Sequence, residues 1–267
     1  PRPRRRLVGD QDHPPVGWGR MTYQLIRGDA LSLPLADGSV DLICTSPPYF
    51  ALRSYTDGGE HYAGQIGSEA TPQAFLEALW AWTTECRRVL KPSGSLWVNL
   101  GDSYSRGSRT TRDGTTDKRR QGDSRVPPCR DIPAKSLMGL PWRYAIGCID
   151  QLDLILRAEV IWSKPNGLPE SVTDRVRRSH EQWFMFTKEP RYFSAVDEVR
   201  EAYHPDSFGK QPGKLAVERR TGKGRGYIDE NRDPNPLGKL PGSVWTVPAE
   251  PLRVPDHLGV DHFAAFP

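Results

Sequence analysis

The sequence predicts an α/β fold, in which helices connect the strands of one sheet. One observation is a strand–helix–strand pattern, formed by an apolar strand over Val40–Cys44, an amphipathic helix that follows Thr71, and a second apolar strand over Ser95–Leu100. Two strands joined in this way lie parallel, with a right-handed crossover. The other observation is that the first strand stops abruptly at Ser46-Pro47-Pro48-Tyr49. Open α/β sheets bind ligands at such carboxyl ends, so we expect the functional site there.

The composition indicates long loops around a modest core. Only 36% of the 267 residues are hydrophobic, while glycine and proline contribute 25 residues each. The net charge of +4 and the pI near 8.9 are a weak indication of a polyanionic partner, and an excess this small is also typical of a solvated surface. The sequence contains no run of about 18 apolar residues, so we expect no membrane span.

The four cysteines, Cys44, Cys86, Cys129 and Cys148, are far apart and form no CxxC pair. This spacing predicts reduced thiols in a cytoplasmic protein rather than a disulfide framework or a zinc site. Cys44 belongs to the apolar first strand, so we expect it in the core and not as a nucleophile. His180-Glu181 is compatible with a metal site or with acid–base chemistry, but no second histidine is nearby, which favours a structural hydrogen bond.

The chain divides into segments of different character. Residues 1–20 are rich in arginine and either precede the natural start or form a basic tail. A main domain is expected over residues 21–199, followed by a polar, basic insert over residues 200–242. Residues 243–267 are expected to begin a further part of the domain, with the chain cut at Pro267.

Short elements lead into the first strand of the pattern. Tyr23–Arg27 alternates apolar and polar residues, which predicts a strand. Gly28-Asp29-Ala30 predicts a turn, and Asp37-Gly38 predicts another before the next strand. A glycine-rich loop is expected over residues 51–70.

The helix after this loop has clear boundary signals. Thr71 is expected to be the N-cap, with Pro72 at the first helical position. Apolar residues recur at helical spacing as far as Val89, and Lys91-Pro92-Ser93-Gly94 is expected to end the helix. The arginine-rich residues 103–135 predict a mobile loop, which is either disordered or in contact with a DNA backbone.

The second half of the chain adds one helix and three strands. The helix is expected to begin at Leu140-Pro141-Trp142 and to turn Ala145, Ile146 and Ile149 towards the core. An irregular loop is predicted over Ser163–Pro169, and residues 171–178 are compatible with a helical turn. The strands are predicted over Leu154–Trp162, Gln182–Thr187 and Ser243–Val247.

The tip Ser46-Pro47-Pro48-Tyr49 combines three groups on a stiff backbone. Two consecutive prolines donate no ladder hydrogen bond, and the residue before a proline is extended. The tip therefore presents a hydroxyl, a carbonyl and an aromatic ring. Asn99 and Asp102 end the next strand and are expected on the same rim. Taken alone, such a tip is equally compatible with a plain strand terminator.

Several phrases of the sequence, in the same order, resemble the amino-methylating DNA methyltransferases, which transfer a methyl group from S-adenosylmethionine to an exocyclic base nitrogen. Their order resembles the permuted beta group, in which the catalytic half precedes the main cofactor motif. The resemblance implies a Rossmann-like class I methyltransferase fold, circularly permuted, over residues 22–197 and 243–267. The matching phrases are Thr45–Tyr49, Gly64–Glu69, Arg88–Tyr104, Gly139–Arg143, Ile161–Arg175, His180-Glu181, Ser243–Trp245 and His262–Pro267.

The resemblance implies a role for each group at the rim. Ser46 Oγ and the Pro47 carbonyl accept hydrogen bonds from the amine, Pro48 keeps the backbone stiff, and Tyr49 stacks on a base that has left the duplex. The residues expected to bind the cofactor are Asp29, Ala30, Asn99, Asp102, His262, Phe263, Phe266 and Pro267. The residues expected to contact DNA are Arg53, Lys164, Asn166, Lys210, Lys214, Arg219, Arg220, Lys223 and Arg225.

Purely structural roles for some of these residues also fit the sequence. Asp29 follows Gly28 and is compatible with a turn-forming role alone. Asn99 and Asp102 are equally compatible with capping the end of their strand.

One departure from the family pattern concerns the cofactor half. In the permuted group a glycine-rich loop follows a phrase like His262–Pro267, whereas this sequence stops at Pro267 and has no such strand–turn–helix elsewhere. The family sheet takes two strands from that half, between the strands at Tyr23 and Val40. We therefore predict an incomplete sheet, with a gap or an exposed edge beside Val40–Cys44.

More than one function class fits the sequence. Serine at position 46 favours a cytosine-N4 enzyme, because aspartate is commoner there in adenine-N6 enzymes, which are the runner-up. The partners implied are double-stranded DNA with a flipped base and a cognate restriction endonuclease. A non-catalytic DNA-binding fragment is the alternative of a different class, and an RNA or protein amine methyltransferase is a third option.

Overall fold

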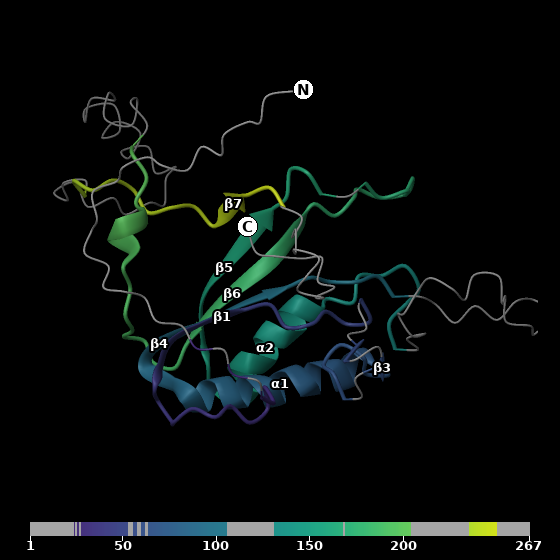
Figure 1. Ribbon diagram of the computed structural model, residues 1–267. Coiled ribbons are helices and arrows are strands. Elements are labelled where there is room, and N and C mark those ends of the chain that lie inside the picture. Colours follow the sequence, from purple (N-terminus) through teal and green to yellow (C-terminus); the bar gives the residue numbers. More distant parts are fainter. Residues whose placement is uncertain are drawn as a thin grey trace, which may run out of the picture.

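The computed structural model describes residues 24, 26, 28–52, 56–57, 60–61, 64–105, 131–167, 169–203 and 235–249. Within these residues the main sheet has five strands, in the order β1 (Val40–Thr45), β4 (Leu90–Leu100), β6 (His180–Thr187), β5 (Ile155–Ser163) and β7 (Val244–Thr246) (Figure 1). A separate pair is formed by β2 (Thr56–Asp57) and β3 (Glu60–His61). The helices are α1 (Pro72–Val89), α2 (Leu140–Leu152) and the short 3-10 helix η2 (Val196–Val199).

The strand directions bring several strand ends to one edge of the sheet. β1 and β4 are parallel, as the strand–helix–strand pattern predicted. β6 runs antiparallel to both β4 and β5, and β7 is parallel to β5. Gln182, near the start of β6, therefore lies opposite Leu100 at the end of β4. The carboxyl ends of β1, β4 and β5 thus share one edge with the amino end of β6.

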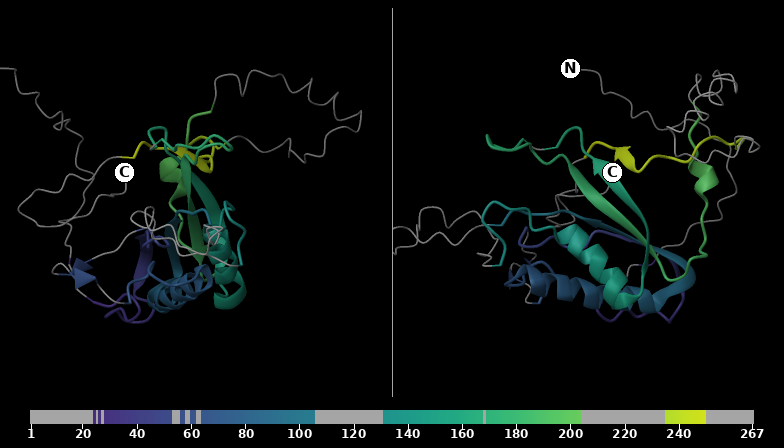
Figure 2. Two further views of the ribbon diagram at one scale, coloured as in Figure 1. Left: turned by 90° about the vertical axis from the view of Figure 1, so that its right-hand side faces the viewer. Right: turned by 180° about the vertical axis from the view of Figure 1, so that it is seen from behind.

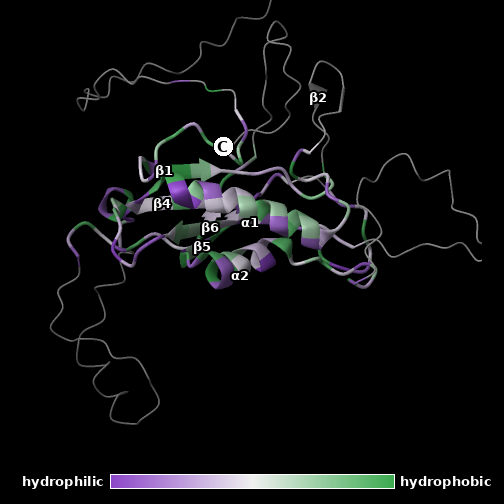
Figure 3. Ribbon diagram, turned by 90° about the horizontal axis from the view of Figure 1, so that it is seen from below, coloured by the Kyte–Doolittle hydropathy of each residue, from purple (hydrophilic) through white to green (hydrophobic). Residues whose placement is uncertain are grey.

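Helices α1 and α2 lie on the same face of the sheet, and the core lies between the two layers (Figures 2 and 3). The two helices pack closely at Gly147, because a Cβ there would overlap the indole ring of Trp80. Each large apolar side chain buried in this layer contributes about 1.5–3 kcal/mol. The most deeply buried members are Leu79, Leu90, Leu96, Val98, Tyr144, Phe184 and Phe186.

Helix α1 has the predicted beginning. Thr71 is the N-cap, and its hydroxyl accepts a hydrogen bond of 3.1 Å from the N–H of Ala74. Pro72 occupies the first helical turn, where its missing N–H has no helical partner to lose. The strands predicted over Leu154–Trp162, Gln182–Thr187 and Ser243–Val247 are also confirmed, with bounds that differ by one or two residues.

Strand β1 is half-exposed, so the prediction of a buried strand is wrong. It ends the strand order, and in the described part of the chain only β4 pairs with it. Ile43 packs against the core, whereas Leu42 is 57% exposed and Cys44 is exposed, contrary to its expected core position. Successive side chains of a strand point to opposite faces, and the helices cover only one face. The exposed edge predicted beside this strand is therefore present within the described residues.

Strand β4 begins earlier than predicted, at Leu90 instead of Ser95. Lys91-Pro92-Ser93-Gly94, expected to end the helix, belongs to the strand. This stretch lies where the register between β1 and β4 shifts. A strand tolerates a proline at such an irregularity, because the ladder does not need its N–H there.

Helix α2 buries a different face from the one predicted. Ala145 is fully buried as expected, but Ile146 and Ile149 are 50% and 43% exposed. Tyr144 and Cys148 occupy the core face instead. The helix carries apolar residues on nearly every side, so its periodicity did not indicate which side the sheet would cover. Residues 171–178 form no helical turn and lead into β6 as an extended segment with bends.

Several predicted segments lie wholly or mainly outside the described residues. They are the basic tail over residues 1–20, the strand over Tyr23–Arg27, most of the loop 103–135, most of the insert 200–242, and the end of the chain from residue 250. The two ends of the insert meet, because the backbones of Glu201 and Lys239 exchange hydrogen bonds of 3.0 and 2.9 Å.

Cys44, Cys86 and Cys148 are free thiols. Burial raises the pKa of the Cys86 and Cys148 thiols to about 12, so both act as small apolar core residues. In the described part of the chain, none of the helices combines the length and the apolar character that crossing a membrane requires.

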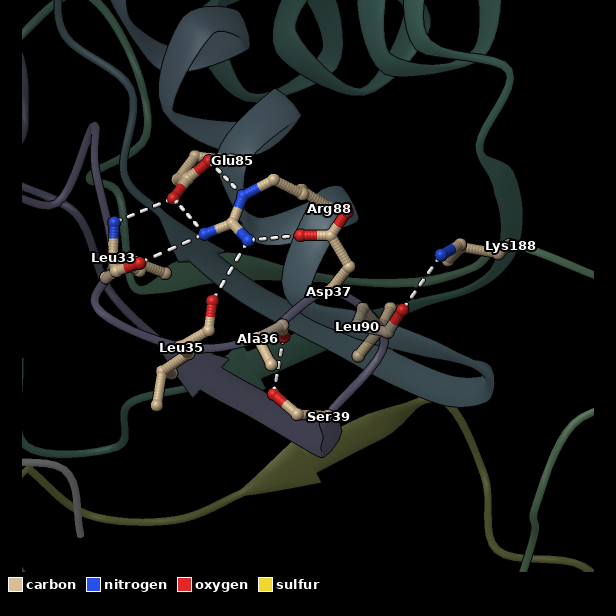
Figure 4. A network of polar contacts seen from close by, with 9 residues as sticks. All are labelled: Leu33, Leu35, Ala36, Asp37, Ser39, Glu85, Arg88, Leu90 and Lys188. Atoms are coloured by element: carbon tan, nitrogen blue, oxygen red, sulfur yellow. Dashed lines mark hydrogen bonds and ion pairs between the residues drawn. The ribbon is translucent and has the colours of Figure 1, made fainter.

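A polar network holds the segment before β1 against the end of α1 (Figure 4). Arg88 donates to both carboxylate oxygens of Glu85 at 2.7 and 2.8 Å, to Asp37 at 2.5 Å, and to the carbonyls of Leu33 and Leu35. The N–H of Leu33 donates to Glu85 at 2.7 Å. The network therefore sets the position from which β1 enters the sheet.

This network predicts a pH-dependent contribution to stability. The Arg88 guanidinium and the Leu33 N–H lower the pKa of Glu85 from 4.5 to about 2. Because ionised Glu85 is favoured in the folded state, its contribution is complete above pH 4.5 and disappears as the pH falls towards 2. We expect Glu85→Gln to lower the Tm at neutral pH and the difference from wild type to vanish near pH 2. The matched control is Glu77→Gln on the same helix, which should stay close to wild type throughout.

Candidate active site

Three strand ends converge on one group of polar side chains. Ser46 and Tyr49 follow the last residue of β1, Asn99 is the penultimate residue of β4, and Glu181 is the second residue of β6. Lys164 joins them from the residue after β5. Ser46, Tyr49, Asn99 and Asp102 are the residues predicted to share one rim. The structure brings the first three together, whereas the Asp102 carboxylate is bound to the start of α2. Glu181 and Lys164 complete the group.

The Ser46–Tyr49 tip is held rigidly by its surroundings. Pro47 is buried. Phe50, three residues later, is 1% exposed and packs against Phe75 with ring centroids 5.4 Å apart. Gly67 lies directly against the tip, since a Cβ there would come within 2.9 Å of the Tyr49 carbonyl oxygen. Gly67 also has a φ of +100°, which favours glycine. The tip therefore has little freedom to move when a ligand binds.

Tyr49 is fixed at both its ring and its hydroxyl. The hydroxyl lies 2.7 Å from Asn99 Oδ1 and 2.8 Å from Glu181 Oε2. The ring packs over Gly101, where a Cβ would come within 2.6 Å of the ring carbon Cε2. Burial raises the pKa of Tyr49 well above its ordinary value, and the negative charge of Glu181 raises it further. The phenol therefore stays protonated at any pH at which the protein works.

Asn99 links the tip to β6 and orients Ser46. Its side chain is 1% exposed, and its amide nitrogen donates to the Gln182 carbonyl at 3.1 Å. Its carbonyl oxygen is thereby turned towards the tip. Ser46 Oγ lies 3.5 Å from both Asn99 Oδ1 and the Tyr49 hydroxyl, so its hydrogen is directed inwards at long distance. The lone pairs of Ser46 are left for an incoming donor.

Glu181 and Lys164 form an ion pair beside Tyr49. Lys164 Nζ lies 2.6 Å from Glu181 Oε1, and the two side chains are 19% and 20% exposed. The same ammonium lies 3.9 Å from the centroid of the Trp162 ring, a favourable cation–π position. The charge of Lys164 is turned to Glu181, and its expected contact with DNA stays a prediction. The structural hydrogen bond expected for His180-Glu181 is present, since the Tyr49 hydroxyl donates to the Glu181 carboxylate.

Asp102 accepts hydrogen bonds at the start of α2. Its carboxylate accepts from the N–H groups of Gly139 at 2.9 Å and Leu140 at 3.1 Å. It therefore supplies the cap that Gly139, the N-cap residue, lacks a side chain to provide. The Asp102 carbonyl accepts from Arg178.

Other predicted site residues lie away from the tip or outside the described part. Asp29 is exposed, and its carboxylate accepts from the N–H of Leu31 at 2.9 Å, which is the turn-forming role; Ala30 lies in the same turn. The amide of Asn166 exchanges hydrogen bonds of 2.7 and 2.8 Å with the backbone of Ala249. Their roles towards cofactor or DNA stay predictions. The residues outside the described part are Arg53, Lys210, Lys214, Arg219, Arg220, Lys223, Arg225, His262, Phe263, Phe266 and Pro267.

Two glycines that support the tip received no role in the sequence analysis. Gly67 and Gly101 both lie inside phrases that carry the family resemblance, in Gly64–Glu69 and in Arg88–Tyr104. The signal available was a glycine inside such a phrase and, for Gly101 alone, its place directly after a strand. What each one touches is visible only in the folded chain.

Comparison with known proteins identifies the class that this site represents. A family model described as DNA methylase, of the N6/N4 methyltransferases, matches residues 40–267. The match covers most of the chain, so the protein belongs to this family. The cytosine-N4-specific PvuII DNA methyltransferase has a similar structure, with a TM-score of 0.52 and 18% identity over 90% of this chain and 64% of that one. The fold is accordingly that of the class I methyltransferases, as the sequence predicted.

Particular relatives share more of the sequence. The type II methyltransferase M.XycI of Xanthomonas campestris pv. cyanopsidis is 44% identical over 66% of this chain and 58% of its own length. The type II methyltransferase M.Cfr9I of Citrobacter freundii is 42% identical over 69% of this chain and 60% of its own length. The chain thus spans somewhat more than half the length of these curated relatives.

The packing of Tyr49 on Gly101 predicts the effect of adding one methyl group. Gly101→Ala should push the Tyr49 ring away and misplace it by about 1 Å, which is enough to lower the rate of a reaction at this site by about 100-fold. Gly242→Ala is the matched control, because a Cβ at Gly242 meets nothing within 4 Å. The reaction rates of the two variants check this expected loss, and their Tm values show whether both are folded. Equal rates in the two variants would contradict the packing argument.

Proposed function

We propose that the protein transfers a methyl group from S-adenosylmethionine to the exocyclic N4 amine of cytosine in DNA. The observation that carries this proposal is the geometry of Ser46. Its hydroxyl lies 3.5 Å from both Asn99 Oδ1 and the Tyr49 hydroxyl and can donate to either, which leaves its lone pairs to accept from a substrate. This is the arrangement that an amine donor needs from its acceptor.

An exocyclic amine is a poor nucleophile because its lone pair is delocalised into the ring of the base. Acceptors on its two hydrogens favour a tetrahedral nitrogen, whose lone pair can face the methyl group. Ser46 Oγ and the Pro47 carbonyl are such acceptors, and the rigid tip holds them without reorganisation. Their contribution is therefore present before the substrate arrives.

Tyr49 supplies the surface on which the target base rests. One face of its ring is covered by Gly101, and its hydroxyl is held by Asn99 and Glu181. A ring fixed in this way stacks on a base at little cost in conformational freedom, worth about 1–3 kcal/mol. That gain offsets part of the cost of taking the base out of the duplex, which is a few kcal/mol.

The described residues do not by themselves complete a site for S-adenosylmethionine. Asn99 and Asp102 have their polar groups committed to Tyr49, Gln182 and the start of α2, and Asp29 closes its own turn. The exposed side of β1, next to Ser46, is the open side from which a methyl donor reaches the amine. The cofactor would supply the methyl group as a sulfonium, and the tip would orient the nitrogen.

Family membership supports DNA as the substrate, and the type II names of the relatives support a place beside a restriction endonuclease. The free thiols of Cys44, Cys86 and Cys148 support a reducing, cytoplasmic location. The runner-up is adenine-N6 methylation, because the same acceptors serve either amine. Serine at position 46 and the cytosine-N4 specificity printed for the PvuII enzyme favour cytosine.

The product of the reaction decides between these functions. We expect DNA treated with the protein and S-adenosylmethionine to contain N4-methylcytosine when its nucleosides are analysed by mass spectrometry. N6-methyladenine alone would overturn the choice of cytosine, and unmodified DNA would favour a DNA-binding fragment. Methylated RNA or protein, with DNA left unmodified, would favour the third option.

Loss of the Ser46 acceptor should weaken the reaction without affecting the fold. We expect Ser46→Ala to lower the rate constant of methyl transfer by about 100-fold at unchanged Tm, since one preorganised hydrogen-bond partner has been removed. Ser171→Ala, an exposed serine in the loop after β5, is the matched control. A Ser46→Ala variant as fast as this control would show that the hydroxyl plays no part.

A further inference from the structure

The short oxygen–oxygen contacts around the Tyr49 hydroxyl can hold one more hydrogen than the phenol itself supplies. The Tyr49 hydroxyl has two short oxygen neighbours, Asn99 Oδ1 at 2.7 Å and Glu181 Oε2 at 2.8 Å. Asn99 Oδ1 and an ionised carboxylate are both acceptors, and a phenol carries a single hydrogen. With Glu181 ionised, one of the two short contacts therefore holds no hydrogen. With Glu181 protonated, Glu181 donates to Tyr49, Tyr49 donates to Asn99, and both contacts are filled.

A third residue, Gln182, fixes the orientation of the Asn99 amide, so the atom that faces Tyr49 is the oxygen. Its amide nitrogen donates to the Gln182 carbonyl, so the amide cannot be turned over without placing two oxygens against each other. The hydrogen of Ser46 does not fill the gap either, because it lies outside the Tyr49–Asn99 contact, 3.5 Å from both atoms. The extra proton can only come to Glu181.

Lys164 favours the opposite state of the same carboxylate. Its ammonium lies 2.6 Å from Glu181 Oε1, while Oε2 faces Tyr49. The two oxygens of Glu181 thus serve two partners, one of which stabilises the ionised form and one of which has room for the protonated form. A carboxylate placed between two such partners is suited to take up a proton and release it again.

We propose that Glu181 receives the proton that the exocyclic amine loses on methylation, by way of Ser46 and Tyr49. This proposal rests on the amine methylation proposed above. Lys164 forms an ion pair with Glu181 and is a positioning residue in this proposal, while the DNA contact expected for it stays a prediction. Glu181 touches neither the base nor the methyl donor and acts through Tyr49.

The step balances in protons and electrons. The nitrogen lone pair forms the N–C bond to the methyl group, the methyl–sulfur bond of the donor breaks, and the nitrogen becomes positively charged. Its excess proton passes to Ser46 Oγ, the Ser46 proton passes to the Tyr49 hydroxyl, and the Tyr49 proton passes to Glu181 Oε2. Ser46 and Tyr49 end as they began, and Glu181 is protonated. The 3.5 Å from Ser46 to Tyr49 must shorten when the base binds, as catalytic hydrogen bonds commonly do.

The surroundings of Glu181 allow the proton to leave afterwards. Lys164 and Glu181 are 19% and 20% exposed, so water reaches the pair. Two other charged or titratable groups lie nearby. They are Arg178, which interacts electrostatically with Tyr49, and His180, which precedes Glu181 in the chain and is exposed. Loss of the proton to water restores the Lys164–Glu181 ion pair for the next reaction.

A pH profile of single-turnover methyl transfer tests the proposal in the full chain. In wild type the rate should fall at acid pH, where Glu181 is already protonated. This fall is the acid limb of the profile. Glu181→Gln should be about 100-fold slower at neutral pH and should lose that acid limb, because no group remains to be titrated. Glu159→Gln, a carboxylate on the neighbouring strand β5, is the matched control with a wild-type profile.

A second measurement does not need turnover. Because all 33 Asp and Glu residues can protonate on acidification, the measurement is a difference spectrum. Subtracting the infrared spectrum of acidified, DNA-free Glu181→Gln from that of wild type should leave a carboxyl band shifted by the contact with Tyr49, and subtracting Glu159→Gln should leave no such shifted band. If Glu181→Gln slows the reaction but keeps the acid limb, or if the band is absent from wild type, the proton route is overturned and Glu181 only holds Tyr49 in place. If wild type methylates no substrate at all, the proposed function itself is wrong, and the route falls with it.

Discussion

The Tyr49 hydroxyl joins the ends of three strands that are far apart in the sequence. It belongs to the tip that follows β1, and it contacts Asn99 on β4 and Glu181 on β6 at 2.7 and 2.8 Å. Without this junction the tip would lose its short hydrogen bonds to β4 and β6, and it follows β1, an edge strand with a single described neighbour. The position of Ser46, three residues earlier, therefore depends on contacts made by Tyr49.

Rigidity at this rim comes from several weak constraints that act together. Two prolines restrict the backbone, Phe50 is anchored in the core, and Gly67 and Gly101 allow the tip and the ring to lie close to neighbouring backbone. Apart from the Pro47 carbonyl, none of these groups takes part in the proposed chemistry. They hold two acceptors in place so that an amine meets them without rearrangement, which is where electrostatic preorganisation has its effect.

The sheet is asymmetric, and the site depends on that asymmetry. Both helices cover one face, while β1 leaves its edge and its second face exposed at Leu42 and Cys44. The acceptors of the tip are therefore accessible from a side that the described residues do not close. On the other side of the rim, the ion pair of Lys164 with Glu181 connects the polar group to water.

Much of the fold could be read from local patterns. Local patterns predicted all five strands of the main sheet in the described part of the chain, and the capping signals at Thr71 and Pro72 predicted where α1 begins. Local patterns failed where the outcome depends on what covers an element. β1 looked buried because its residues are apolar, yet it lies at an edge. α2 has apolar residues on several sides, and only packing against the sheet selected Tyr144 and Cys148 over Ile146 and Ile149.

The sequence by itself determined the tip, since two prolines after an apolar strand can only end it, and the order of its phrases determined the family. It also brought Ser46 and Asn99 to the same rim, because parallel strands end at the same edge of a sheet. Only the tertiary structure decided the partners of Tyr49. β6 enters the sheet antiparallel, so its second residue, Glu181, lies beside the end of β4. There it forms the ion pair with Lys164. That antiparallel return is a long-range pairing, and no local pattern in the sequence encodes it.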